Sequence, residues 1–235
     1  MKKIIFCSKH DPRKVVLEFP EDKYKDVLDD GEHLIFMDDK SLVRIPLGSW
    51  DIMNALVPKI LKYCPGDIVE VGMGESTTIF ADHAHEAGVN LFSCDIQMGG
   101  MFKVFEKKLF DNHICFIGRS EEFIKTYDGN PSIVFLDGEH KYKTIKKEVE
   151  FFLPRLKTGG VMFMHDTFPP LERQLTVDEN GFAPGDIYKA RQELERRTDV
   201  DVFTWPYSAL NMGLTMVMKH DKDRPYWREN GKAGE

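Results

Sequence analysis

Short apolar runs alternate with stretches of helical periodicity from about residue 51 onward. Five of the runs are rich in β-branched and aromatic residues, which is typical of strands buried on both faces. They lie at residues 67–72, 91–96, 113–118, 132–137 and 160–166. Apolar residues at helical spacing predict helices at residues 51–64, 76–87, 101–110, 121–126 and 142–153. Strand alternating with helix predicts a parallel sheet covered by helices on both faces.

The last part of the chain departs from this alternation. A loop over 167–184, which carries several Pro and Gly residues, leads to a charged helix over 187–197. Loops of this length inside compact domains are usually lids or binding loops. Two further apolar runs, 200–205 and 213–219, are joined by a connection too short for a parallel crossover, so they are expected to be antiparallel.

The chain shows no sign of division into several domains. No internal repeat and no Gly/Ser linker interrupts its 235 residues, which fit one large domain. The first fifty residues mix short apolar stretches with charge clusters and have no clear period. We therefore assign residues 1–50 to an N-terminal addition that could cover a substrate, 51–219 to the main domain, and 220–235 to a polar tail.

Charge and cysteine content narrow the classes of partner. The 32 basic and 39 acidic residues give a net charge of −7, which provides no general attraction to nucleic acid or anionic lipid. The four cysteines form no C-x-x-C pair, so neither a zinc site nor a disulfide framework is indicated. The opening MKKIIFCSKHD is too short for a signal peptide or a membrane span. We expect a cytoplasmic protein without nucleic-acid or membrane partners, and a homo-oligomer stays open.

Glycines follow the first strand in the segment EVGMGEST, residues 70–77. In an open parallel sheet, ligands bind beyond the carboxyl ends of the strands. Gly72 and Gly74 permit a tight turn and close approach of a ligand, and the next helix begins with free N–H groups. Such turns also occur where they only pack a strand against a helix. Thr77 stands where a dinucleotide fingerprint has its third glycine, which disfavours NAD and FAD.

Polar residues also follow the next two strands. Asp95 ends the second strand, 25 positions after Glu70, where a carboxylate can accept both hydroxyls of a ribose. Ser120 and Glu121 follow the third strand and could contact an adenine edge, although a helix cap explains them equally well. Because no phosphate-binding lysine motif is present, the pattern favours a nucleoside-containing ligand without a pyrophosphate.

The segments VEVGMGESTTIFA, FSCDI and IVFLDGEHKYKTIKKEVEFFLPRLKTGGVMFMHDT, in this order, resemble the class I S-adenosylmethionine-dependent methyltransferases. The resemblance covers roughly residues 50–219 and is strongest to small-molecule O-methyltransferases of the catechol and macrolide-sugar types. It implies an α/β fold, with a doubly wound, Rossmann-like sheet of seven mostly parallel strands, an antiparallel last strand and helices on both faces. It also implies that S-adenosylmethionine lies over the glycine turn, with its ribose and adenine on the next two strand ends. The expected cofactor-binding residues are Glu70, Gly72, Gly74, Ser76, Thr77, Asp95, Ser120 and Glu121.

Acids and histidines follow the fourth and fifth strands, in the segments DGEH and HD. Both strand ends face the same edge of a parallel sheet, so Asp137, His140, His165 and Asp166 are expected to converge. Methyl transfer to a hydroxyl requires that the hydroxyl lose its proton. A histidine can take that proton, and a divalent cation can favour its loss.

The resemblance gives these four residues roles. In the macrolide-sugar methyltransferases, a D-x-x-H segment like DGEH supplies a metal ligand and a base, and an acidic pair after the next strand completes the metal site. We therefore assign Asp137, His165 and Asp166 to a metal and Asp137, His140 and His165 to catalysis. His165 stands where an oxygen ligand is expected, and imidazole suits softer ions than Mg²⁺, so the need for a metal stays open. An iron site with both histidines, or a cluster that only hydrogen-bonds locally, are the alternatives.

The expected activity is O-methylation of a small hydroxylated molecule, such as a sugar or a secondary metabolite. Two alternatives stay open at this point. One is another enzyme that handles S-adenosylmethionine or a nucleotide, because one fold supports many chemistries. The other is a silent module that binds the cofactor without turnover.

Overall fold

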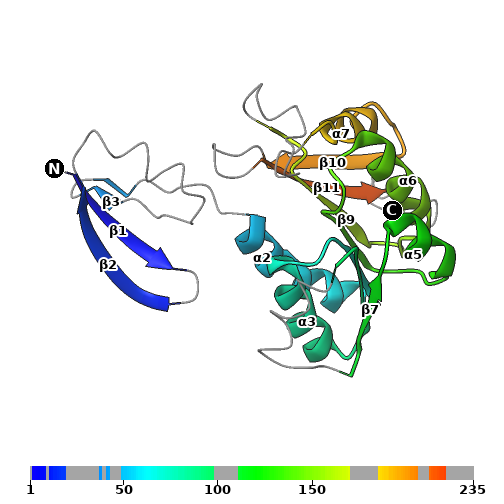
Figure 1. Ribbon diagram of the computed structural model, residues 1–235, viewed down its shortest axis with the longest axis horizontal. Helices are drawn as coiled ribbons and strands as arrows, with labels where there is room; N and C mark the ends of the chain where they lie inside the picture. The colour runs from blue at the N-terminus through cyan, green and yellow to red at the C-terminus, as the bar shows by residue number, and fades with distance from the viewer. Residues whose placement is uncertain are drawn as a thin grey trace, which may run out of the picture.

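The computed structural model describes residues 2–8, 11–19, 37–38, 41–42, 49–97, 111–169, 185–205 and 212–220. Its centre is a sheet of seven strands (Figure 1). The strands are β5 (Ile68–Val71), β6 (Leu91–Asp95), β7 (His113–Ile117), β8 (Ile133–Leu136), β9 (Val161–His165), β10 (Val200–Trp205) and β11 (Leu214–Lys219). Their order across the sheet is β10-β11-β9-β8-β5-β6-β7.

All strands of this sheet except β11 run in one direction. β5 pairs in parallel with β6 and β8, β6 with β7, and β8 with β9. β11, the last strand, is antiparallel to both β9 and β10. The chain moves outward from β5 to β7 and then returns to the other side of β5, so the strand order reverses beside β5. This is the switch point at which open α/β sheets bind ligands.

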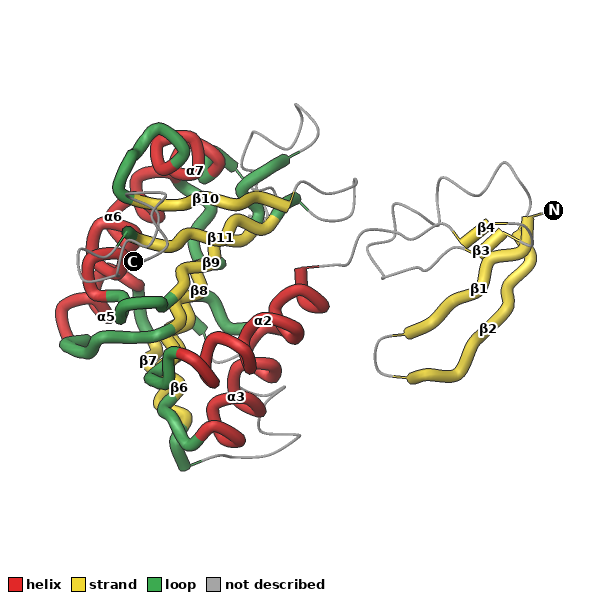
Figure 2. Tube along the Cα trace, turned by 180° about the vertical axis from the view of Figure 1, so that it is seen from behind, coloured by secondary structure: helices red, strands yellow, loops and turns green. Residues whose placement is uncertain are grey.

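Helices cover both faces of the sheet, as Figure 2 shows. They are α2 (Ser49–Tyr63), α3 (Glu75–Ala87), α5 (Ser120–Thr126), α6 (Tyr142–Phe152) and α7 (Tyr188–Leu194), with a 3-10 turn η2 (Leu153–Arg155) after α6. α2 and α3 lie on one face, and α5, α6 and α7 lie on the other. The predicted doubly wound sheet with an antiparallel last strand is therefore confirmed.

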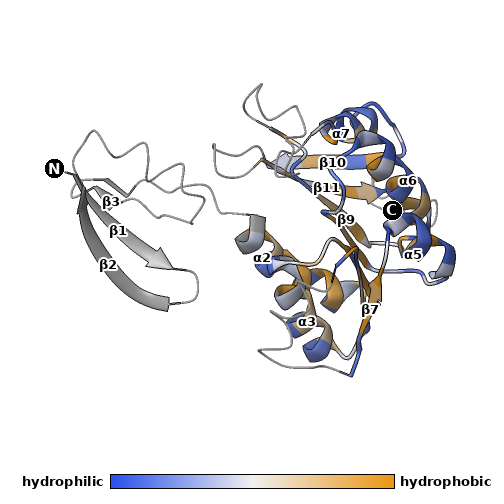
Figure 3. Cartoon of the chain, in the orientation of Figure 1, coloured by the Kyte–Doolittle hydropathy of each residue, from blue (hydrophilic) through white to orange (hydrophobic). Residues whose placement is uncertain are grey.

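Two hydrophobic cores hold the layers together. Phe80 of α3 packs with Phe135 of β8 in the core beneath α2 and α3. Phe152 of α6 and Val134 of β8 belong to the core on the opposite face. Neighbouring residues of β8 thus serve different cores, as the pleat of a strand requires. This is why β8 is continuously apolar, and the hydropathy colours show that the sheet as a whole is mostly apolar (Figure 3).

Some expected segments differ from the structure or lie beyond it. The N-terminal addition contains two antiparallel pairs that the pattern did not predict, because charged residues interrupt the apolar runs. They are β1 (Lys2–Ser8) with β2 (Asp11–Phe19), and β3 (Met37–Asp38) with β4 (Ser41–Leu42). α7 is shorter than the expected helix over 187–197. The expected helix over 101–110 and loop positions 170–184 lie outside the described residues.

The ends of β5 and β8 approach each other closely at Gly72. The φ angle of Gly72 is +89°, and a Cβ atom there would lie 2.0 Å from the backbone oxygen of Asp137. Gly74 is different, because its φ of −171° is open to any residue and a Cβ would meet no described atom within 4 Å. Only the first glycine of the turn is therefore required by the packing.

Glu148 is a buried carboxyl on the sheet-facing side of α6, with a relative exposure of 1%. Within the described residues, neither of its oxygens has a hydrogen-bond partner of ordinary geometry. Burial raises the pKa of Glu148 to about 7, and the Ser120 hydroxyl opposes that rise only in part. An ionised carboxylate at this position is costly to the folded protein.

Within the glycine turn, Gly72→Ala should destabilise the fold much more than Gly74→Ala. The first substitution combines a strained φ with a clash against backbone and should lower the free energy of unfolding by about 3 kcal/mol or more. The second should cost less than about 1 kcal/mol. Urea denaturation of the two variants measures the difference, and equal losses would contradict the close approach of β5 to Asp137.

Glu148→Met should gain stability relative to the wild type as the pH rises. The carboxyl of the unfolded chain ionises near pH 4.5 and that of the folded chain near pH 7, so the wild type loses stability between these values. The advantage of E148M should grow by about 2–3 kcal/mol between pH 5 and pH 8 in urea denaturation. Glu150→Met, at an exposed position of the same helix, is the control and should show no such trend.

Candidate active site

A cavity of about 600 Å³ opens at the carboxyl ends of the parallel strands. Its walls are the segments that follow β5, β6, β7 and β8, and they include residues 71–72, 94–97, 118–121 and 137–141. Most of the candidate residues expected from the sequence follow these same strands. A cavity of this size accommodates a nucleoside-sized ligand with a short side chain.

Asp95 stands on the wall of the cavity with its carboxylate fixed at two points. Its Oδ2 accepts the N–H of Met73 at 2.8 Å, and its Oδ1 accepts the N–H of Gln97 at 2.9 Å. Each oxygen keeps lone-pair capacity for a further donor. The carboxylate therefore ties the turn after β5 to the end of β6 and still presents two acceptors to a diol.

Ser120 and Glu121, at the start of α5, also line the cavity. The Glu121 carboxylate is exposed and forms an ion pair with Lys147 of α6. This pair lowers the pKa of Glu121, so that side chain is charged at the rim. Together with Gly72 and Asp95, these residues are the expected cofactor ligands that the structure brings to one cavity.

Glu70, Ser76 and Thr77 lie beneath the turn and are fully buried. Glu70 Oε1 accepts the hydroxyls of Ser76 at 2.5 Å and Thr77 at 3.1 Å, and Oε2 accepts that of Ser93 at 2.8 Å. Burial raises the pKa of Glu70 to about 7, while the three hydroxyls act in the opposite direction. These side chains, like Gly74, do not line the cavity, so any contact that they make with a cofactor stays a prediction.

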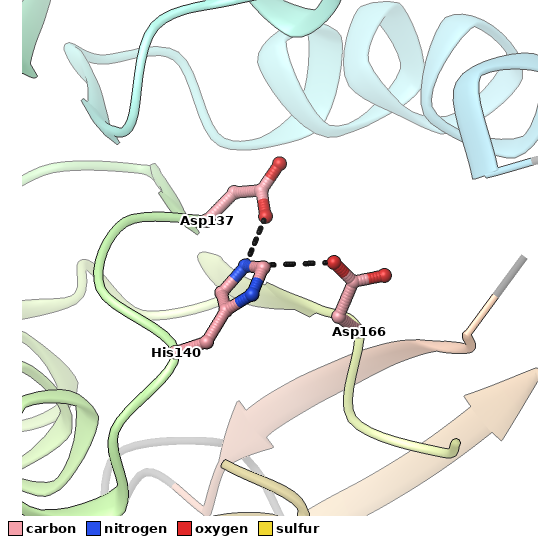
Figure 4. A group of neighbouring side chains, drawn as sticks. All are labelled: Asp137, His140 and Asp166. Carbon is pink, nitrogen blue, oxygen red and sulfur yellow. Dashed lines mark ion pairs between the residues drawn. The ribbon is translucent and has the colours of Figure 1, made fainter. Parts of the chain in front are cut away.

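Asp137, His140 and Asp166 converge beside the cavity, and Figure 4 shows their side chains pointing toward one another. His140 Nε2 lies 3.7 Å from Asp137 Oδ1 and 3.5 Å from Asp166 Oδ2. One donor atom from each residue falls within 4.8 Å of the other two, a spacing that could hold a metal ion. Asp137 and His140 also line the cavity, so the cluster and the cavity are continuous.

His165 belongs to the same cluster but differs in its contacts. Its Nδ1 lies 3.1 Å from Asp166 Oδ1 and 3.5 Å from Asp137 Oδ1. Its ring stacks on the indole of Trp50, with centroids 5.0 Å apart and planes within 3°. The donor group that converges contains His140 together with Asp137 and Asp166, and the expectation that His165 is a metal ligand stays a prediction. No sequence pattern linked Trp50 to the site, because the contact joins the first turn of α2 to the end of β9.

The cluster is electrostatically coupled. Burial alone would lower the pKa of His165, but the carboxylates of Asp137 and Asp166 raise it well above its usual value. In turn, although burial raises the pKa of Asp137, His165 and His140 bring it down to about 2. Without a bound cation, Asp137 is therefore ionised and His165 is protonated at neutral pH.

The segment after β9 is held in an unusual conformation. Asp166 has a φ of +56°, the one positive φ among the described residues other than glycine. Arg191 Nε of α7 donates to the backbone oxygen of Thr167 at 2.9 Å, and the Thr167 hydroxyl lies 2.7 Å from that of Thr215 in β11. These contacts from α7 and β11 hold Thr167, the residue that follows Asp166. Sequence reasoning missed Arg191, which lies on a helix with no recognisable motif.

The chain is similar to known methyltransferases in sequence and in fold. Residues 69–167 match the sequence family described as methyltransferase domain. No curated protein matches the chain in sequence. The SAH-bound methyltransferase PaMTH1 of Podospora anserina is 16% identical, with a TM-score of 0.55, over 88% of this chain and 99% of that one.

Two further solved structures are similar to the chain. The O-methyltransferase TomG of Streptomyces achromogenes, in complex with SAM, is 16% identical, with a TM-score of 0.57, over 77% of this chain and 84% of that one. MycE from the mycinamycin biosynthetic pathway, in complex with Mg, SAH and mycinamycin VI, is 13% identical. That match has a TM-score of 0.50 and covers 76% of this chain and 52% of MycE.

Because these solved structures are only 13–16% identical to the chain, they show that it shares their fold. The match to the methyltransferase domain covers β5 to β9, whose ends include the walls of the cavity, and it confirms the resemblance to methyltransferases that the sequence indicated. Residues 69–167 thus match a methyltransferase domain, and the chain has the fold of the class I S-adenosylmethionine-dependent methyltransferases that it resembles in sequence.

Proposed function

We propose that the protein transfers the methyl group of S-adenosylmethionine to a hydroxyl of a small molecule. The observation that supports this proposal is the continuity of the cavity with the cluster of Asp137, His140 and Asp166. A methyl donor in the cavity would lie next to groups that can orient a hydroxyl and take its proton. Two proteins of similar fold are methyltransferases that act in biosynthesis: TomG is involved in tomaymycin synthesis, and MycE belongs to the mycinamycin biosynthetic pathway.

Four residues of the cavity wall are proposed to bind the cofactor. Gly72 gives the methionine part room, because any side chain there is excluded. Asp95 accepts hydrogen bonds from the ribose hydroxyls with the lone pairs that its backbone contacts leave free. Ser120 and Glu121 lie farther along the wall, where the adenine would extend.

The donor set suits a divalent cation. Asp137 and Asp166 offer carboxylate oxygens and His140 offers an imidazole nitrogen, a mixture that fits Mn²⁺, Fe²⁺ or Zn²⁺ better than Mg²⁺. When bound, the cation would lower the pKa of an acceptor hydroxyl. We place His140 in this set rather than His165, because His165 is stacked on Trp50.

The proton of the acceptor hydroxyl needs a base, and two histidines are available. Without a cation, His140 Nε2 faces the carboxylates of Asp137 and Asp166, and both would stabilise the imidazolium that forms. We therefore propose His140 as the proton acceptor in a metal-free site. If His140 binds a cation, the same nitrogen cannot take the proton, and His165 is left to do so.

The acceptor is proposed to be a small molecule such as a sugar or a secondary metabolite. Residues 1–50 and the loop 167–184 would surround it, because the acceptor must approach from the side of the cluster.

Within the described residues, no helix combines the length and hydrophobicity that a membrane crossing requires. A cytoplasmic location and the absence of a nucleic-acid partner complete the proposal, and the oligomeric state stays open.

Binding of S-adenosylhomocysteine, followed by calorimetry, tests the cofactor assignment. The wild type should bind it, and Asp95→Ala should weaken binding by about 2 kcal/mol because two charge-assisted hydrogen bonds are lost. Asp82→Ala, at a surface position of α3, is the control and should bind like the wild type. Binding of NAD but of neither adenosyl compound would contradict the proposed function.

Turnover with and without a chelator tests the cluster. His140→Ala should lower kcat by about 10²–10⁴-fold, the usual contribution of a general base, with S-adenosylhomocysteine affinity within about twofold. If a cation is required, Asp137→Ala and Asp166→Asn should abolish both Mn²⁺ binding, read by electron paramagnetic resonance, and metal-stimulated turnover. Full activity in EDTA would show a metal-free site, and full activity of His140→Ala in EDTA would exclude His140 as the base.

A further inference from the structure

A chain of hydrogen bonds crosses the sheet from its edge strand to the glycine turn. Ser93 of β6 lies between Glu70 of β5 and Cys115 of β7 in the strand register, and His113 precedes Cys115 by two positions on the same face. His113 Nε2 is 2.9 Å from Ser93 Oγ, and Ser93 Oγ donates to Glu70 Oε2 at 2.8 Å. Neither His113 nor Ser93 lines the cavity.

The donors and acceptors along this chain can be assigned. When Glu70 is ionised, its carboxylate can only accept, so the Ser93 hydroxyl donates its single proton to Glu70. Ser93 Oγ must then accept from His113, which requires a proton on Nε2 of the imidazole. Burial lowers the pKa of His113, so the neutral ring in this one tautomer is the form that completes the chain.

The other end of the chain reaches the backbone of the turn. Thr77 Oγ1 donates to Glu70 and accepts the N–H of Gly74 at 2.9 Å. On the opposite side of the turn, the N–H of Met73 donates to Asp95. Two successive amides of the turn are thus held, one by a residue of the cavity wall and one by the buried chain that begins at His113.

We propose that His113 and Ser93 are positioning residues for the cofactor: they orient Glu70, and through Thr77 they fix the Gly74 amide and the turn on which the methionine part rests. This inference rests on the proposed function. Stability alone does not explain the arrangement, because a buried carboxylate with its hydrogen-bonding shell is costly and an apolar residue would fill the same space at lower cost. Buried polar networks instead restrict a site to one geometry.

A pair of substitutions at His113 separates this role from a structural one. His113→Leu removes the donor to Ser93, whereas His113→Gln retains an N–H at a similar distance from the backbone. H113L should weaken S-adenosylhomocysteine binding about threefold to tenfold and raise KM for S-adenosylmethionine, with kcat at saturation unchanged. H113Q should restore the affinity to within about twofold. His220→Leu, whose side chain pairs with Asp201 near the opposite edge of the sheet, is the matched control and should bind like the wild type.

A second variant and a spectroscopic readout complete the experiment. Ser93→Ala should weaken binding like H113L, and the double variant should bind no more weakly than S93A, because both act through one chain. The amide resonance of Gly74 should shift in H113L and return toward its wild-type position in H113Q. Wild-type affinity and an unmoved Gly74 resonance in H113L or S93A would overturn the inference. If the wild type binds no S-adenosylhomocysteine, the proposed function fails, while the Gly74 resonance still shows whether His113 positions the turn.

Discussion

The backbone of Gly72 approaches the backbone of Asp137 so closely that no side chain fits between them. This contact joins the ends of β5 and β8, the two strands beside the switch point. It sets the place where the cavity wall after β5 meets the acid and histidine cluster after β8. The position of the cavity wall relative to the cluster therefore depends on the absence of a side chain at Gly72.

Charge is distributed unevenly around this contact. On the cluster side, Asp137 and Asp166 face two histidines, and their attraction holds His165 in its protonated form when no cation is present. In β5, by contrast, the carboxylate of Glu70 accepts hydrogen bonds only from hydroxyl groups within the described residues, those of Ser76, Thr77 and Ser93. Asp137 and Asp166 are thus placed to interact with positively charged groups, whereas Glu70 interacts with neutral hydrogen-bond donors.

The sheet and the convergence of its strand ends could be predicted because both follow from local signals. The run of β8 is apolar on both faces, since Val134 and Phe135 belong to different cores. Once parallel strands are inferred, residues that directly follow them must share one edge, and Asp137 and Asp166 do. The choice between His140 and His165 in the converging group could not be predicted, because it depends on side-chain directions.

Other parts of the site depend on contacts that the sequence does not encode locally. Trp50 reaches His165 only because α2 packs over the end of β9. His113 lies in the edge strand β7, which carries no motif, and its hydrogen bond to Ser93 follows from the register of β6 and β7, which the sequence does not give. The hairpin of β1 and β2 was missed for another reason, since charged residues flank its short apolar runs and leave no clear period.

The left-handed backbone of Asp166 also limits which side chains can occupy that position. Aspartate and asparagine adopt this conformation readily, whereas β-branched and bulky residues do not. The main chain therefore favours glycine, asparagine or aspartate at this position, and aspartate is the one of the three that supplies a carboxylate. At the end of β9 the backbone thus limits the choice of residue, and the Asp166 carboxylate lies within 3.5 Å of both His140 and His165.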